Sequence, residues 1–106
     1  MSKLSGLKFK VVGVTFTNED TGVPRQSILA SMTPADLVFL EREPNNKFDK
    51  NAVKVMTLHG QVGYVGKDYA AILAEMMDGG RQFKATIDTL DIYKGNYYMV
   101  IKVDEV

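Results

Sequence analysis

A short polar segment between two apolar stretches carries the residue types best suited to chemistry. Residues 40–55 read LEREPNNKFDKNAVKV and hold one proline, three asparagines, an aromatic ring and an aspartate. Asn and Asp side chains bond to nearby backbone N–H groups and so fix the shape of a turn. A plain connector between strands does not need this combination, so we interpret the segment as a binding loop. The alternative is a structural loop with Phe48 tucked into the core.

Few residues in the chain suit catalysis. His59 is the one histidine and there is no cysteine, so a Ser-His-Asp triad would need its base on an exposed hairpin tip, and zinc would lack ligands. Gly60, Gly63 and Gly66 are spaced like a phosphate loop but lack the Gly-Lys-Ser/Thr ending, and turn geometry explains them better. We therefore expect a protein that is not an enzyme, with no catalytic residue, no metal and no cofactor.

Three acidic residues offer the main alternative chemistry. Glu41, Glu43 and Asp49 could collect a magnesium ion, because two-metal nuclease sites are built from carboxylates and water. The basic side chains nearby in sequence are Arg42, Lys47 and Lys50. They are close enough to give ordinary solvated ion pairs instead. A small metal-dependent nuclease is therefore the less favoured hypothesis.

The composition is that of an ordinary globular protein without overall charge. Of 106 residues, 45% are hydrophobic, and 13 basic residues balance 13 acidic ones. A neutral chain has no long-range field to hold it on a polyanion, so any contact with nucleic acid must be local. The absence of cysteine fits a reducing cytoplasm, and no apolar run is long enough for a secretion signal or a membrane span. We expect one cytoplasmic domain over residues 1–106, with its core in residues 7–103.

The residue pattern predicts a protein built mainly of short strands. Apolar residues alternate with lysines at the start of residues 7–16, which predicts a half-buried strand that Gly13 interrupts at a bulge or a close backbone approach. Further β-prone stretches are residues 37–43, 52–58, 61–65, 83–93 and 97–103. Turns at residues 59–60 and 94–96 join the last four into two hairpins. A sheet of about six antiparallel strands hides its edges by curling or closing, so we expect a small β-barrel.

One main helix and one short helical turn complete the prediction. In residues 67–78 apolar residues fall at i, i+3, i+4, i+7 and i+8, on one face of a helix that Gly79-Gly80 can end. These residues are Tyr69, Ile72, Leu73, Met76 and Met77. A short second helical turn is expected in residues 27–32, ending near Thr33 because the residue before a proline is steered out of the α region.

Two long motifs resemble those of a known family. EREPNNKFDKNAVKV, followed by QVGYVGKDYAAILAEMMDGG, resembles the signature of HIRAN domains, and the similarity extends over about residues 7–103. The resemblance implies an OB-like β-barrel. HIRAN domains occur at the N-terminus of some SWI/SNF-type DNA-remodelling ATPases and stand alone in bacteria, and characterised members capture single-stranded DNA at a free 3′-hydroxyl. The resemblance thus implies a non-catalytic DNA-binding module of repair or replication. Its expected partners are single-stranded DNA ends and a separately encoded helicase or ATPase, and no contact with a membrane is expected.

The resemblance also implies a set of binding residues. Asp49 matches the family acid that accepts a hydrogen bond from the terminal 3′-hydroxyl, which is chemically coherent because a carboxylate repels phosphate and suits only the end of a strand. Phe48 and Phe16 match aromatic positions that contact the terminal bases. Tyr64 takes a position that is a histidine or another polar ring in relatives. The polar groups that match positions near the end phosphates are Asn46 and Lys67.

One departure from the family concerns charge. Some family members place an arginine just before the first aromatic residue, where this chain has Thr15, which offers at most a hydroxyl contact. Lysines that can compensate, or that are simply solubilising, are Lys8, Lys10, Lys47 and Lys50. Tyr97 offers a further stacking face, with a core or surface role as its alternative. The neutral charge and Thr15 favour a second hypothesis, a protein-interaction adaptor on the same barrel.

Overall fold

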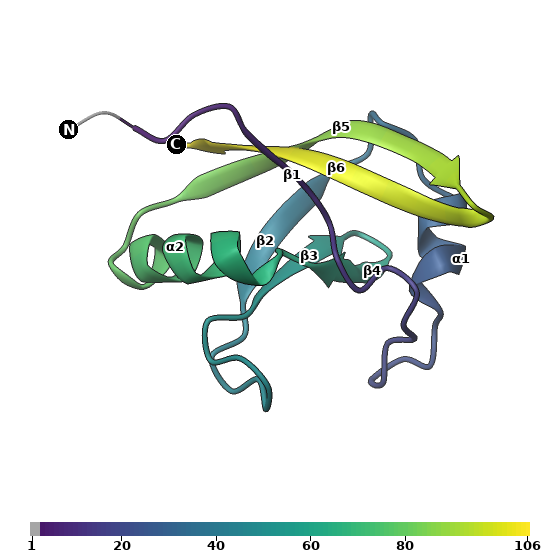
Figure 1. Cartoon of the computed structure of the whole chain (residues 1–106), viewed down its shortest axis with the longest axis horizontal. Coiled ribbons are helices and arrows are strands. Elements are labelled where there is room, and N and C mark those ends of the chain that lie inside the picture. The colour runs from purple at the N-terminus through teal and green to yellow at the C-terminus, as the bar shows by residue number, and fades with distance from the viewer. Residues whose placement is uncertain (1–2) are drawn as a thin grey trace.

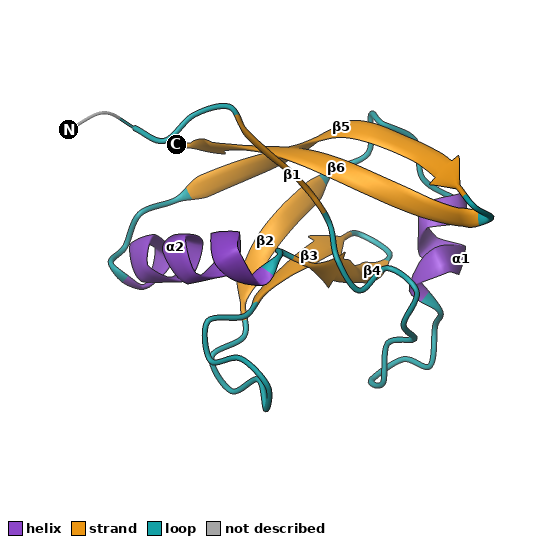
Figure 2. Cartoon of the chain, viewed as in Figure 1, coloured by secondary structure: helices purple, strands orange, loops and turns teal. Residues whose placement is uncertain are grey.

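Six strands and two helices make up the described part of the protein, residues 3–106 of a computed structural model (Figure 1). In chain order they are β1 (Leu7–Lys10), α1 (Arg25–Ala30), β2 (Val38–Arg42), β3 (Val53–Thr57), β4 (Gly60–Tyr64), α2 (Lys67–Asp78), β5 (Phe83–Tyr93) and β6 (Asn96–Glu105). Figure 2 shows the strands as the main structural layer, with α2 the longer of the two helices. The predicted β-rich fold with one main helix and a short second one is confirmed.

The six strands form one antiparallel sheet in the order β1-β6-β5-β2-β3-β4. Its two edges meet just beyond β1, where Val12 pairs with Tyr64 at the end of β4. Each of these residues donates its N–H to the other's carbonyl oxygen, both at 2.9 Å. The sheet therefore curls into the small OB-like barrel that was expected, and a single residue pair joins its edges.

The core of the barrel is made mostly of aliphatic side chains. The largest fully buried ones are Leu29, Leu73, Met99, Ile101, Val11, Val53, Val55, Val62 and Val103. Leu29 comes from α1 and Leu73 from α2, so both helices contribute to the same cluster as the strands. Burial of such side chains is the main force that holds a domain of this size together.

The sequence predicts the bounds of α2 correctly, but the apolar face that it identifies is only partly the face that the structure buries. The helix buries Ala70, Leu73 and Ala74, whereas Ile72 is 50% exposed. Alanines let the helix approach the sheet closely, and a count of large apolar residues overlooks them. Tyr69 lies at the margin, where its ring stacks on Phe9 with centroids 4.9 Å apart.

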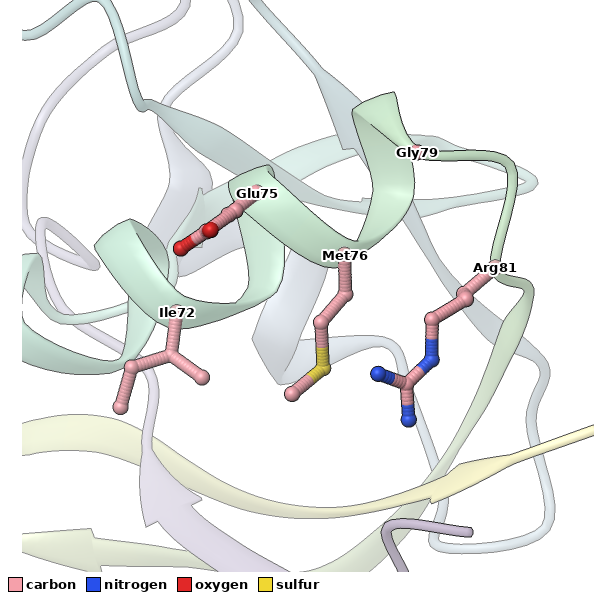
Figure 3. A pocket seen from close by; sticks show the side chains of 5 residues that line it. All are labelled: Ile72, Glu75, Met76, Gly79 and Arg81. Carbon is pink, nitrogen blue, oxygen red and sulfur yellow. The ribbon is translucent and has the colours of Figure 1, made fainter. Parts of the chain in front are cut away.

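Residues of α2 and of the turn after it line a pocket of about 360 Å³. Figure 3 shows the side chains of Ile72, Met76 and Arg81 directed toward it, at the point where the helix ends near Gly79. Arg81 forms an ion pair with Glu105 at the end of β6. Neither helix among residues 3–106 has the length and apolar character needed to cross a membrane.

The remaining differences from prediction lie near the first loop. The first strand ends at Lys10 rather than continuing to residue 16, because Gly13 adopts a left-handed conformation (φ 72°) that turns the chain away after Val12. Helix α1 begins at Arg25, two residues before the predicted start. In the last hairpin the turn has two residues, 94–95, both with positive φ, as the twist of a tight hairpin favours.

Candidate functional site

The loop between β2 and β3 is an ordered turn built around Asn46. The side-chain oxygen of Asn46 accepts hydrogen bonds from the backbone N–H groups of Phe48 (2.8 Å) and Asp49 (2.9 Å). One carboxylate oxygen of Asp49 then accepts the N–H of Asn51 at 2.9 Å. These bonds are those of a turn in which Asn and Asp side chains take the place of backbone carbonyls. The prediction of an ordered loop built on Asn and Asp is confirmed.

Phe48 and Phe16 both present their rings to solvent. Phe48 is 94% exposed and Phe16 is 66% exposed, so the alternative in which Phe48 lies in the core is wrong. The two rings come from different loops, residues 43–52 and 13–24, and Figure 1 shows that these loops project from the same side of the barrel. Exposed rings of this kind are free to stack on planar ligands.

The carboxylate of Asp49 keeps one oxygen atom available. Its Oδ1 accepts the bond from Asn51, while Oδ2 accepts no hydrogen bond from residues 3–106. No Lys, Arg or His nitrogen in this part of the chain lies within 4.0 Å of the carboxylate. Asp49 is half-buried. The pKa of Arg42 is raised mainly by its bond to Asp78, and the charge of Asp49 is close enough to help raise it. Asp49 and Arg42 nevertheless form no ion pair within 4.0 Å, so one carboxylate oxygen of Asp49 stays available as an acceptor.

Arg42 connects the base of this loop to α2. Its guanidinium donates to both carboxylate oxygens of Asp78 (2.9 and 3.0 Å) and to the carbonyl oxygens of Lys50 and Ala52 (3.1 and 2.7 Å). The hydrogen bond from Arg42 lowers the pKa of the Asp78 carboxyl below its usual value. The bonds of Arg42 therefore hold the base of the loop against α2, while Phe48 near the tip of the loop stays exposed.

Tyr64 links the loop to the barrel through Glu43. The Tyr64 hydroxyl donates to a Glu43 carboxylate oxygen at 2.7 Å, and the Asn46 amide donates to the same oxygen at 2.6 Å. Burial opposes ionisation of Glu43, but the bonds from Asn46 and Tyr64 and the nearby Lys54 ammonium together lower its pKa. Burial, with the bond to Glu43, raises the pKa of the Tyr64 hydroxyl. Glu43 is thus an ionised anchor for the loop, a role that sequence reasoning missed.

The structure does not gather the three acids considered for a metal site. The Lys54 ammonium nitrogen lies 3.5 Å from a carboxylate oxygen of Glu41 and 3.3 Å from one of Glu43. Asp49 instead accepts a hydrogen bond from the backbone of its own turn. Within residues 3–106 no group of three or more His, Cys, Asp or Glu side chains is placed to hold a metal ion. This geometry gives the nuclease hypothesis no support.

A second side chain that sequence reasoning missed is Arg25, the first residue of α1. It is only 7% exposed. Its Nε donates to the side-chain oxygen of Asn18 and one Nη donates to the carbonyl oxygen of Gly13, both at 2.8 Å. The guanidinium carbon lies 5.4 Å from the centre of the Tyr64 ring. A side chain on Gly13 would meet both Arg25 Nη1 at 3.2 Å and the Phe16 ring at 3.6 Å.

The other predicted residues are distributed around this cluster. Thr15 is exposed beside Phe16, and the exposed lysines Lys47, Lys50 and Lys67 form no ion pair within residues 3–106. Tyr97 lies apart, because its backbone bonds to Gln26 of α1 and its side chain packs against the core. The structure thus connects Asn46, Phe48 and Asp49 to Tyr64 through one hydrogen-bond network. Phe16 and Tyr64 both approach Gly13.

This chain is similar to known proteins in both sequence and fold. The helicase-like transcription factors of Oryctolagus cuniculus and Homo sapiens are 57% and 50% identical to this chain over 44 residues, which is 41% of this chain but 4% of each relative. The crystal structure of the HIRAN domain of human HLTF superposes with a TM-score of 0.73 and 27% identity, covering 97% of this chain and 76% of that chain.

The solved structure of a bacterial protein has a similar fold. A protein from Lactobacillus plantarum superposes with a TM-score of 0.70 and 25% identity, covering 96% of this chain and 94% of that chain. The sequence itself matches the HIRAN domain family over residues 6–99, which includes both exposed loops and the connecting Tyr64. This chain therefore belongs to the HIRAN domain family.

Proposed function

We propose that this chain is a non-catalytic module that binds single-stranded DNA at a free 3′-hydroxyl end. The observation that carries the proposal is Asp49, a carboxylate with one unbonded oxygen beside the exposed Phe48 ring. A carboxylate repels a phosphate and accepts a hydrogen bond from a hydroxyl. An acid beside a stacking ring therefore suits the end of a strand rather than its interior.

The exposed rings account for affinity without sequence preference. Phe48 and Phe16 lie on separate loops that project from the same side of the barrel, and Tyr64 is bonded to the loop of Phe48 and approaches Gly13 in the loop of Phe16. Each base stacked on an aromatic ring contributes about 1 to 3 kcal/mol, whatever the base. The relatives are named helicase-like transcription factors, a name that fits action on DNA. Single-stranded ends are thus the proposed ligand, with a separately encoded helicase or ATPase as the proposed protein partner.

Three exposed lysines, two in the loop and one at the start of α2, fit a small number of phosphate contacts. Lys47, Lys50 and Lys67 are exposed and unpaired within residues 3–106, while the chain as a whole is neutral. About two or three phosphate contacts give a slope of about −1.5 to −2 in log K against log salt concentration. A much steeper slope would instead indicate general polyanion binding.

The decisive experiment compares two strand ends. Fluorescence anisotropy with a labelled six-thymidine strand is expected to show binding at least about tenfold tighter for a 3′-hydroxyl than for a 3′-phosphate, because a phosphate beside Asp49 is repelled by several kcal/mol at short range. Equal affinity for the two strands would remove Asp49 from the proposed role, and the absence of binding to either strand would reject DNA binding altogether.

Truncation of the more exposed ring tests the stacking role. Phe48→Ala is expected to weaken binding of the same strand by about 1 to 3 kcal/mol and to leave the melting temperature unchanged, because the ring is 94% exposed. Leu58→Ala is the matched control, since Leu58 is 75% exposed on the β3–β4 turn, and it should change neither quantity. Parallel losses of affinity and melting temperature in Phe48→Ala would indicate a structural role for the ring.

A protein-interaction adaptor is the second candidate. The neutral net charge and Thr15, where some relatives carry arginine, favour it. Partners that stay bound after nuclease treatment, together with no detectable binding of oligonucleotides, would select this function.

A further inference from the structure

Arg25 differs from the other arginines of the chain in having no acidic partner. Arg42 pairs with Asp78 and Arg81 pairs with Glu105. Within residues 3–106 no carboxylate oxygen lies within 4.0 Å of the Arg25 guanidinium. The side chain is nevertheless 93% removed from solvent, since only 7% of its surface is exposed. Arg25 is therefore a buried cation that has an aromatic ring and two neutral acceptors around it but no carboxylate partner in the described part of the chain.

The guanidinium is held at two points and keeps its third nitrogen available. A guanidinium carries five N–H groups. Nε donates to Asn18 and Nη1 to the carbonyl oxygen of Gly13, whereas Nη2 donates to no residue in 3–106. No side-chain nitrogen or oxygen of this part of the chain is both fully buried and without a hydrogen bond. Nη2 must therefore reach solvent, with its two donors unused.

The available end of Arg25 lies at the proposed DNA site. The backbone N–H of Arg25 donates to the carbonyl oxygen of Phe16 at 3.1 Å, and the guanidinium lies over the Tyr64 ring. Gly13 allows this approach, because a Cβ at that position would lie 3.2 Å from Nη1, 3.6 Å from the Phe16 ring and 3.9 Å from the Tyr64 ring. The guanidinium, the Phe16 ring and the Tyr64 ring thus all lie close to Gly13.

Charge and geometry together favour an anionic ligand for Arg25. Neutral acceptors satisfy two of its hydrogen bonds but leave the buried charge without a counter-charge, which is costly. A planar guanidinium held in place is well suited to phosphate oxygens, which it binds with charge-assisted hydrogen bonds. Thr15, next to Phe16, offers no charge of its own.

We propose that Arg25 binds a backbone phosphate of the captured strand through Nη2 and supplies the cation that is missing at Thr15. This inference rests on the proposed function, since the phosphate belongs to the strand whose terminal hydroxyl meets Asp49. The competing role for Arg25 is purely structural, holding residues 13–25 together through Gly13 and Asn18.

Salt dependence separates the two roles. With the labelled six-thymidine 3′-hydroxyl strand at 50 to 200 mM salt, Arg25→Gln is expected to bind about tenfold to a hundredfold more weakly at the lowest salt. The slope of log K against log salt should become shallower by about 0.7, the value for one single-strand phosphate contact. Arg25→Lys should keep the wild-type slope. A loss of affinity in Arg25→Gln with an unchanged slope would overturn the proposal in favour of the structural role.

Arg81→Gln is the matched control for charge. It removes the same charge from an arginine paired with Glu105, just before β5, whose start lies at the opposite end of the molecule from α1 in Figure 1. The slope for Arg81→Gln should equal that of the wild type, and an equal reduction in both variants would overturn a specific contact at Arg25. Wild-type protein that binds no strand would refute the proposed function itself, whereas normal wild-type binding with a normal Arg25→Gln slope refutes only the contact.

A measurement on the wild-type protein covers the case in which Arg25→Gln does not fold. The Nε–H resonance of Arg25 is expected to shift on saturation with the six-thymidine strand, and a resonance that stays in place would overturn the proposal. Inorganic phosphate at the same concentration is the comparison. If it shifts the resonance as far as the strand does but does not compete with the strand, Arg25 binds a free anion independently, and the assignment to the strand backbone is wrong.

Discussion

A protein carrying Asp49→Asn is expected to bind 3′-hydroxyl and 3′-phosphate strands with similar affinity. The amide oxygen can still accept the N–H of Asn51, which Asp49 accepts at 2.9 Å, so the turn should keep its shape. The charged acceptor for the hydroxyl is lost, and hydrogen bonds to charged groups contribute about 1.5 to 3 kcal/mol. Affinity for the hydroxyl strand should therefore fall about tenfold to a hundredfold, while affinity for the phosphate strand rises as repulsion disappears. Anisotropy titrations with both strands measure the change.

Asp36→Asn is the control for this substitution. Asp36 also accepts a backbone N–H within its own loop, that of Thr33 at 2.8 Å, but it lies in the turn before β2 rather than after it. The control variant should retain the wild-type preference for the hydroxyl strand. A preference that survives in Asp49→Asn, or disappears equally in both variants, would show that Asp49 does not read the strand end.

Adding one methyl group at Gly63 is expected to destabilise the protein by about 3 kcal/mol or more, at the upper end of the usual cost of overpacking. A Cβ on Gly63 would lie 2.6 Å from Val11 Cγ1 and closer still to the carbonyl oxygen of Val12. That carbonyl accepts the N–H of Tyr64 in the pair that joins the sheet edges. The clash is with backbone and cannot be relieved by rotating a side chain. Urea unfolding of Gly63→Ala measures the loss.

Gly66→Ala provides the comparison within the same segment. A Cβ on Gly66 would meet nothing closer than Val12 Cγ1 at 3.9 Å, an ordinary contact, and the residue has φ −56°. Its position as N-cap of α2 limits the expected cost to less than about 1 kcal/mol. Similar stabilities for the Gly63 and Gly66 variants would mean that β4 can move away from residues 11–12, contrary to the packing seen here.

The parts of the fold that local signals determine were predictable from sequence. Helix α2 has the predicted bounds, residues 67–78, and so does strand β5, residues 83–93. Apolar periodicity marks the helix, and glycine turns mark the hairpins. The ordered Asn46 turn was predictable for the same reason, because Asn and Asp bond to backbone groups only two or three residues away.

Features that depend on contacts between distant segments were not predictable. Gly63 looks like a turn residue in sequence, yet its small size is required by residues 11–12 of another segment. Glu43 accepts a hydrogen bond from Tyr64, 21 residues away. Arg25 donates to the carbonyl oxygen of Gly13 and lies over the Tyr64 ring. A linear pattern contains no signal for such pairs. The same limit explains why the apolar face of α2 is only partly the buried one, since only the sheet decides which side of a helix is covered.

The joining of the sheet edges by Val12 and Tyr64 also ties together the two loops that carry the exposed rings. Val12 leads directly into the loop that carries Phe16, and Tyr64 anchors the loop that carries Phe48 through Glu43 and Asn46. We therefore expect this one backbone pair to influence how Phe16 and Phe48 are placed relative to each other. Selection for a tight fold at this pair and selection for a fixed grip on a ligand would act on the same two residues.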